Sequence, residues 1–249
     1  MLSKAKIKHI QSLRLGKFRK LHGQFVAEGS TNVLDFIGSK LRTINIFATA
    51  EWKNRYRKEL HGVLITEVDV RELSKISVLK TAPEVVAVFT LPLEKQIDWH
   101  KTTGVILMLD DIRDPGNLGT IIRTADWFGI RQIVCSEETV DCYNPKVVQA
   151  SMGSLARVEL LYENLEWAIK KKPANIPVYG AVLNGQSIRE MEKPEQVIVL
   201  VGSEAHGISG KLLKLINKKI SIPASMGGGA ESLNASIATA IICYALSGR

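Results

Sequence analysis

The apolar positions of the chain follow two periods, one typical of strands and one typical of amphipathic helices. In the first part of the chain, four short apolar stretches between helical segments predict strands: 24–27, 43–48, 63–66 and 85–91. We therefore expect residues 1–95 to form a small α/β domain. The polar stretch 92–104 shows no clear period and predicts the connection to a second domain, residues 104–249.

The predicted strands of the second domain are more apolar than those of the first: 105–109, 132–135, 178–183, 197–201 and 219–222. Strands that crossover helices bury on both faces have this composition, so we expect an α/β domain with a mostly parallel sheet. In such sheets ligands bind beyond the carboxyl ends of the strands. Chemistry is therefore expected in the loops that follow these strands.

The first of these loops, residues 110–117, leads into a helix with apolar positions at helical spacing. Asn117 is expected to cap that helix. Gly116, Gly119 and Arg123 are expected to share one face of its first turns, which would leave the arginine room beside a ligand. A simpler interpretation is that Asn117 only caps and Arg123 points into water. Each internal glycine costs a helix about 1 kcal/mol, which favours close approach of another group.

The second loop, residues 202–209, has the glycine spacing of a phosphate-binding loop. Ile208 stands where that loop needs a lysine, so an ATPase is disfavoured. Glu204 would repel a triphosphate, but it can accept hydrogen bonds from an amine-bearing ligand or from an arginine. No role is assigned to His206.

The third loop, residues 223–234, contains three consecutive glycines, which free the backbone. Ser232 and Asn234 place short hydrogen-bonding side chains at the start of a helix, residues 235–246. This helix is apolar almost all round. Because such a helix must be covered on more than one side, we expect a subunit interface there.

Charge is distributed unevenly along the chain. The 249 residues carry a formal net charge of +8; residues 1–99 hold 17 Lys or Arg against 10 Asp or Glu, and residues 100–249 hold 16 against 15. Seven basic residues precede the first acidic one: Lys4, Lys6, Lys8, Arg14, Lys17, Arg19 and Lys20. This segment can follow phosphates or form a solvated basic end, and the asymmetry between the two parts favours nucleic acid.

The three cysteines, Cys135, Cys142 and Cys243, show neither a CxxC pair nor metal-ligand spacing. We expect them to be small buried side chains outside any disulfide framework. The amino terminus lacks a secretory signal, and no apolar stretch approaches the ~20 residues that cross a bilayer. A cytoplasmic protein without a membrane partner is therefore expected.

Taken together, the three loops resemble motifs one, two and three of the SpoU family of RNA 2'-O-ribose methyltransferases, part of the SPOUT superfamily. The resemblance covers the second domain, including Asn144-Pro145 and the stretch 149–154, which is similar to a connector helix of the family. The first domain is similar to the ribosomal-protein-like substrate-binding domain of many members, and 24–29 resembles its FxxEG element. The resemblance implies a deep trefoil knot in the α/β domain, which is an exception to unknotted topology.

The resemblance also implies S-adenosylmethionine as the cofactor, with no catalytic metal. It assigns cofactor binding to Leu183, Val201, Gly202, Ile222 and Leu233, and catalysis to Asn117, Arg123, Glu204, Ser232 and Asn234. Arg123 would activate the 2'-hydroxyl, either as the base or, because the pKa of arginine is above about 12, by electrostatics. The third loop holds seven residues, 224–230, where members usually have about five. Because Ile222 directly precedes this longer loop, the departure affects how Ile222 is matched to the cofactor-binding position of the family.

RNA is the expected partner, together with a second copy of the chain that packs through the knot and the final helix. RNA binding is expected of Lys4, Lys8, Arg14, Lys17, Arg19 and Lys20. The added first domain favours ribosomal RNA over transfer RNA. One alternative is a noncatalytic RNA-binding or ribosome-assembly protein, which would have no need of all five catalytic residues. Another is a Rossmann-type nucleotide enzyme, which the absence of GxGxxG after a first strand disfavours.

Overall fold

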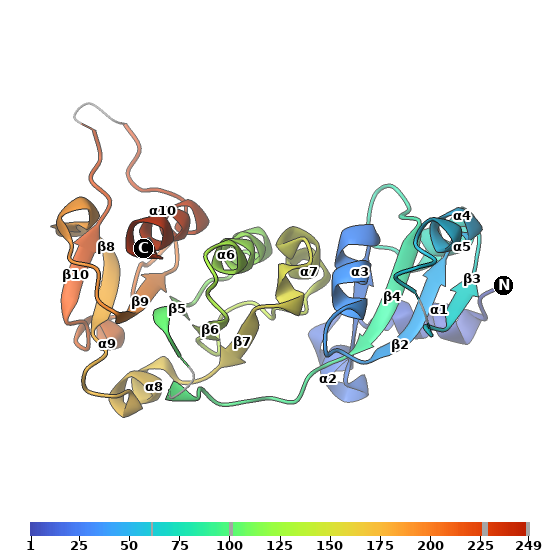
Figure 1. Cartoon of the computed structure of the whole chain (residues 1–249), viewed down its shortest axis with the longest axis horizontal. Helices are drawn as coiled ribbons and strands as arrows, with labels where there is room; N and C mark the ends of the chain where they lie inside the picture. The colour runs from blue at the N-terminus through green and yellow to red at the C-terminus, as the bar shows by residue number, and fades with distance from the viewer. Residues whose placement is uncertain (61, 100–101, 226–228, 248–249) are drawn as a thin grey trace. The chain divides into compact units, whose positions relative to one another are not determined.

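The computed structural model describes residues 1–60, 62–99, 102–225 and 229–247. Its contacts divide the chain into two compact units (Figure 1). Unit 1 comprises Met1–Leu93 together with Asp141–Arg157, and unit 2 comprises Glu94–Val140 together with Val158–Arg249. In the described part of the chain, no helix combines the length and the apolar character that crossing a membrane requires.

Unit 1 contains a four-stranded mixed sheet with the order β1-β4-β2-β3. Its strands are β1 (Gln24–Glu28), β2 (Thr43–Ala48), β3 (Ile65–Glu67) and β4 (Val85–Thr90). The β1/β4 and β4/β2 pairs are antiparallel, and the β2/β3 pair is parallel. The helices of the same stretch are α1 (Lys4–Ser12), α2 (Gly16–His22), α3 (Ser30–Ile37), α4 (Ala50–Arg55) and α5 (Val70–Ile76). The four strands predicted for this part are confirmed, with β3 starting two residues later than expected.

The second segment of unit 1 lies between two strands of unit 2 in the sequence. It contains α7 (Pro145–Ser151) and the short 3₁₀ helix η2 (Ser154–Ala156), and α7 contacts β1. Gly153 has φ 86°, and a Cβ there would lie 2.0 Å from an Asp35 carboxylate oxygen. Its N–H donates to Asn32 Oδ1 at 2.7 Å. The helix expected after Asn144 is thus present, and its contacts group it with unit 1 rather than with the second domain. The domain limits 1–95 and 104–249 stay a prediction.

Unit 2 contains a six-stranded sheet, in which every pair of neighbours is parallel and the order is β10-β8-β9-β5-β6-β7. The strands are β5 (Gly104–Asp110), β6 (Gln132–Cys135), β7 (Glu159–Tyr162), β8 (Val178–Ser187), β9 (Gln196–Gly202) and β10 (Lys218–Ser221). The five strands predicted for this domain and the parallel sheet are confirmed. The pattern missed β7, an edge strand of four residues of which only Leu161 is fully buried.

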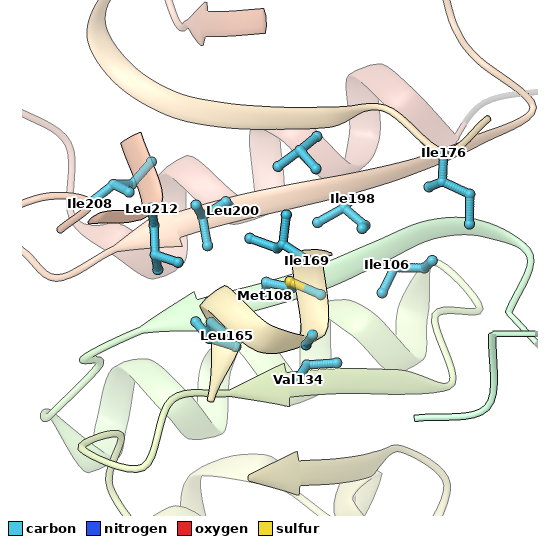
Figure 2. Packing of buried hydrophobic residues seen from close by; sticks show 12 residues of the cluster. Ile106, Met108, Val134, Leu165, Ile169, Ile176, Ile198, Leu200, Ile208 and Leu212 are labelled. Carbon is cyan, nitrogen blue, oxygen red and sulfur yellow. The ribbon is translucent and has the colours of Figure 1, made fainter. Parts of the chain in front are cut away.

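Helices cover both faces of this sheet, which explains the nearly continuous apolar character of its strands. On one face, α8 (Leu165–Lys171) and α9 (Gly210–Leu213) share a buried cluster with alternate residues of β5 and β9. Figure 2 shows Leu165 and Ile169 of α8 beside Met108 of β5. On the other face, α6 (Pro115–Trp127) and α10 (Ala235–Ser247) lie against each other, and α10 also contacts β5 and β9 (Figure 1). A short 3₁₀ helix, η3 (Ile188–Glu190), follows β8.

Candidate active site

The first loop joins β5 to α6, and its helix begins earlier than the sequence pattern predicts. Asp114 is the N-cap, its side chain accepts the N–H of Asn117 at 2.8 Å, and Pro115 occupies the first turn. The prediction that Asn117 caps the helix is therefore wrong. An aspartate directly before a proline combines a preferred N-cap with a residue that lacks an N–H and has a helical φ, so the helix starts there. Asn117 falls inside the first turn, and its side-chain amide is available for other contacts.

Asn117 joins the three loops. Its Nδ2 donates a hydrogen bond to a carboxylate oxygen of Glu204 in the second loop. Its Oδ1 accepts a hydrogen bond of 2.9 Å from Nδ2 of Asn234 in the third loop. The structure thus brings together three of the five residues expected to act in catalysis, from segments that are far apart in the sequence.

Arg123 lies about two turns along α6 from this cluster. Its side chain is exposed and, among the residues that the structure describes, forms neither an ion pair nor a hydrogen bond. Gly116 and Thr120 are exposed on the same helix, whereas Gly119 is buried. The expectation that Gly119 shares the exposed face with Arg123 is therefore wrong. Among the described residues, Arg123 is an unpaired cation on the same helix as Asn117 and is available to a ligand.

The second loop folds back on itself after β9. Ser203 and Gly207 form an isolated bridge, and the Gly207 N–H donates to the Ser203 carbonyl at 2.8 Å. Gly202 must be a glycine, because a Cβ would lie 2.0 Å from the carbonyl carbon of Gly207. Ile208 is buried in the cluster that includes residues of α8 and α9. The position that a phosphate-binding loop would fill with a lysine is therefore part of the hydrophobic core.

The third loop ends in a cap. Asn234 Oδ1 accepts the N–H of Ser236 at 2.9 Å and that of Ile237 at 3.3 Å, so Asn234 starts α10 while its amide reaches Asn117. Ser232 is exposed, and in the described part of the chain no hydrogen bond joins it to the cluster. Of the expected glycine triplet, Gly227 and Gly228 lie outside the described residues.

The residues expected to bind a cofactor differ in exposure. Val201 is buried at the end of β9, and Gly202 and Ile222 are half-buried. Leu183 and Leu233 are large apolar side chains that are 71% and 46% exposed. Exposed apolar side chains together with backbone groups at the ends of strands suit a ligand that combines an aromatic base with hydrogen-bonding groups. The donor set therefore fits an adenosine-containing cofactor.

The basic residues expected to contact RNA lie on α1, on α2 and, for Arg14, in the turn between these helices of unit 1. Five of the six are exposed: Lys4, Lys8, Arg14, Lys17 and Lys20. Arg14 donates to the Ser77 carbonyl at 2.8 Å. Arg19 differs from expectation because its side chain is only 3% exposed. Its guanidinium donates to Asp141 Oδ2 at 2.5 and 3.0 Å and to the carbonyls of Leu13 and Arg14. Arg19 is a structural residue of unit 1, and its guanidinium is not available to a phosphate.

The final helix carries an uncovered apolar stripe. Ile237, Ile241 and Tyr244 of α10 are 50%, 36% and 75% exposed, and Trp127 at the end of the neighbouring α6 is 84% exposed. All three cysteines are buried and stand outside any disulfide, as expected. Among the described residues, no group of His, Cys, Asp and Glu could hold a metal ion.

Two acidic residues of the first loop were missed by the sequence pattern. Asp114 could have been recognised as an N-cap from the proline that follows it. Asp110, at the end of β5, is 7% exposed and accepts the backbone N–H of Ser209 at 2.7 Å. Only the pairing of β5 with β9 places it beside the second loop, and no local signal indicates that pairing.

Comparisons with known proteins decide the family. The model of the SpoU rRNA Methylase family matches residues 104–244, and the model of the MRM3-like substrate binding domain matches residues 4–87. The chain belongs to the SpoU methylase family. It is an RNA methyltransferase of this family, and its cofactor is S-adenosylmethionine.

Individual relatives of the SpoU family cover almost the entire chain. A 23S rRNA (guanosine(2553)-2'-O)-methyltransferase, RlmP, from Bacillus subtilis is 30% identical over 98% of this chain and 96% of its own. A solved structure of a TrmH-family protein from Porphyromonas gingivalis has a TM-score of 0.87 and 38% identity, covering 99% of this chain and 98% of that one. An AdoMet-bound rRNA methyltransferase from Sinorhizobium meliloti has a TM-score of 0.85 and 28% identity, covering 99% and 96%.

Proposed function

We propose that this SpoU-family enzyme transfers the methyl group of S-adenosylmethionine to a ribose 2'-hydroxyl of ribosomal RNA. The observation that carries the proposal is the cluster of Glu204, Asn117 and Asn234 with the free cation Arg123 on the same helix as Asn117. Two relatives are named as 23S rRNA 2'-O-methyltransferases, the Bacillus subtilis protein and one from Streptomyces viridochromogenes that is 33% identical over 65% of this chain. Ribosomal RNA is therefore favoured over transfer RNA.

The residues of the cluster suit the needs of this reaction. A 2'-hydroxyl is a poor nucleophile until its proton is drawn away, and it must approach the methyl carbon in line with the departing sulfur. When bound, the cofactor supplies an electrophilic methyl group on a sulfonium. The ribose oxygen would form a bond to that methyl carbon as the carbon–sulfur bond breaks, and the hydroxyl proton would leave to a base or to water.

Arg123 is the residue proposed to act on the hydroxyl. Its guanidinium carries a permanent positive charge, as arginine side chains do in proteins. An exposed guanidinium can hold the adjoining phosphate with two parallel hydrogen bonds and stabilise the negative charge that develops on the ribose oxygen. We propose this electrostatic role in preference to proton abstraction.

Glu204 and Asn117 are proposed to orient the substrate and the cofactor. The side-chain amide of Asn117 donates a hydrogen bond to one oxygen of the Glu204 carboxylate, which fixes the orientation of that carboxylate. The remaining acceptor sites of Glu204 can receive a hydroxyl of the ribose or the amino group of the cofactor. Ser232 stands two residues before Asn234, is exposed, and is proposed to contact the ribose or the cofactor.

Residues of the second and third loops and of β8 are proposed to hold the cofactor. Val201, Gly202 and Ile222 would offer backbone groups to it, and Leu183 and Leu233 would offer exposed apolar side chains to its adenine. We infer that the last strand and helix pass through an earlier loop to form the deep trefoil knot of the family.

A second copy of the chain is proposed to cover the apolar stripe of Ile237, Ile241, Tyr244 and Trp127. These side chains are large and exposed on two adjacent helices, which is unfavourable in water unless a partner covers them. A twofold axis would bring the same surface of both copies together.

RNA is proposed to bind unit 1 along α1 and α2 through the exposed cations Lys4, Lys8, Arg14, Lys17 and Lys20. Their contribution should depend on salt, because each neutralised phosphate releases counterions.

The experiment that tests the substrate maps methylation in a strain that lacks the gene. Ribosomal and transfer RNA from this strain and from its parent are digested, and 2'-O-methylated nucleotides are located by mass spectrometry. One 23S position that loses its methyl group only in the deletion strain would support the proposal. Loss of a transfer RNA methyl group instead would overturn the ribosomal assignment. An unchanged pattern, with RNA binding retained by the purified protein, would favour the noncatalytic alternative.

A further inference from the structure

Asp110 is a buried carboxylate that the methyl-transfer chemistry does not use. It ends β5, its side chain is 7% exposed, and its Oδ2 accepts the N–H of Ser209 at 2.7 Å. A buried carboxylate is costly unless hydrogen bonds compensate it, so its position must serve the surrounding structure.

Asp110 contacts both ends of the second loop. Its backbone pairs with Gly202 at the end of β9, where the loop begins. Its side chain holds Ser209, where the loop ends and α9 begins. The side chain of Ser209 does not cap α9. The start of this helix is instead held through the Ser209 N–H, which donates to the carboxylate of Asp110.

Between these two points the loop is nearly closed. The Ser203–Gly207 bridge and the 2.8 Å hydrogen bond within it make one compact turn, and the Gly202 backbone lies directly against Gly207. Glu204 lies within this turn. If both ends are fixed, the turn cannot rotate as a body, and the carboxylate of Glu204 stays in reach of Asn117.

Asp110 also begins the first loop. The next residue, Asp111, has φ 60°, and its N–H is held by Ser136 Oγ at 3.0 Å. The chain then reaches Asp114, which caps α6, and Asn117 in the first turn. Asp110 is therefore connected both to the loop that positions Asn117 and to the loop that positions Glu204.

We propose that Asp110 is a positioning residue for methyl transfer, which fixes the second loop relative to the first so that Glu204 meets Asn117. This inference rests on the roles proposed for Glu204 and Asn117. It assigns to Asp110 no contact with the RNA or the cofactor.

The test compares Asp110→Ala with Asp110→Asn. Asparagine keeps an oxygen that can accept the Ser209 N–H, whereas alanine removes it. At saturating cofactor and RNA, kcat of Asp110→Ala should fall about a hundredfold, since displacement of a reacting group by about 1 Å can cost that much. Asp110→Asn should recover most of the loss. Backbone amides of residues 202–209 should exchange with deuterium faster in Asp110→Ala and near the wild-type rate in Asp110→Asn.

A matched control is Asp69→Ala in unit 1. Asp69 also accepts a backbone N–H, from Glu72 at 2.8 Å, at the start of a helix. Its loss should lower the melting temperature but leave kcat unchanged, which separates positioning from general stability.

Unchanged deuterium exchange at residues 202–209 in Asp110→Ala would overturn the proposal, because Asp110 would then not fix the second loop. Faster exchange together with a wild-type kcat would instead overturn the roles proposed for Asn117 and Glu204, on which the inference rests. The two measurements therefore distinguish failure of this inference from failure of the proposed function.

Discussion

Nδ2 of Asn234 donates a 2.9 Å hydrogen bond to Oδ1 of Asn117, so the cap of the last helix is joined to the first turn of a helix more than one hundred residues earlier. The side-chain amide of Asn117 also donates a hydrogen bond to Glu204. The side-chain amide of Asn117 therefore donates to the second loop and accepts from the third. Neither loop could be replaced independently without leaving Asn117 half satisfied.

Replacing Asn117 with aspartate tests this junction. The variant loses the Nδ2–H donor and places a carboxylate beside Glu204, so the two groups repel each other. Loss of one oriented donor at a reaction centre typically costs ~10²–10³ in rate, and we expect a fall in kcat of that order. A radiometric methyl-transfer assay measures it. The control is Asn164→Asp, because Asn164 caps α8 through its oxygen and aspartate caps equally well. Full activity of Asn117→Asp would contradict the role of the cluster.

Replacing Arg123 with alanine should abolish transfer and leave the affinity for S-adenosylmethionine near normal. The side chain is exposed, so its loss should change the free energy of unfolding by less than about 0.5 kcal/mol. Calorimetric titration of the cofactor and urea unfolding check the two expectations. Arg131→Ala is the comparison, since Arg131 is an exposed arginine of the same unit that pairs with Asp126 at 3.5 Å. Transfer that persists in Arg123→Ala at the rate of Arg131→Ala would refute the assignment.

Replacing Ile241 with glutamate should separate a dimer into monomers. The residue is 36% exposed on the apolar stripe of α10, so the charge would face the partner copy and not the core. Sedimentation equilibrium should give twice the chain mass of 27.5 kDa for the wild type and the single mass for the variant. Leu64→Glu, at an exposed leucine of unit 1, should keep the wild-type mass. A monomeric wild-type protein would rule out the proposed interface.

The stability of the protein should decline steeply in alkali. Burial raises the pKa of the Cys243 thiol from 9.0 to about 12 and raises the pKa of Cys135 as well. The unfolded chain releases both protons near pH 9 while the folded chain keeps them, so the unfolded state is increasingly favoured above that pH. Each thiol should remove about 1.4 kcal/mol per pH unit between pH 9 and its folded pKa. Below pH 9 both thiols are protonated in both states, and this effect vanishes.

Urea unfolding at pH 8, 9, 10 and 11 measures this decline. The variant with Cys135→Ala and Cys243→Ala should be less stable at pH 8, because each substitution leaves a small cavity, but its stability should fall less steeply with pH. Other groups also titrate in this range, and they contribute equally to both proteins. Equal slopes for the wild type and the variant would show that the thiols are not responsible.

The sequence predicted the strands well because both faces of the second sheet are buried. The run 105–109 needs no polar face, and its apolar character is visible without knowledge of the fold. The pattern did not reveal β7, whose four residues are mostly half-buried. It also placed the start of α6 three residues late, because Asn117 and Asp114 are both good caps and only the proline distinguishes them.

The site was accessible from the sequence only in part. The loops after three strands indicated Asn117, Glu204 and Asn234, because parallel strands deliver their carboxyl ends to one edge. Other features of the structure depend on contacts between residues that are far apart in the sequence. The burial of Arg19 depends on Asp141, which is 122 residues away, and the position of Asp110 depends on the neighbouring strand β9.

Methyl transfer itself can be followed with tritium, from the methyl group of S-adenosylmethionine into ribosomal RNA. Purified wild-type protein and its Arg123→Ala variant are incubated with ribosomal RNA, which is then digested to nucleosides and separated. We expect the wild-type protein to yield one labelled 2'-O-methylnucleoside and the variant to yield none. Label on a base instead of the ribose, or no label with cofactor bound, would contradict this expectation.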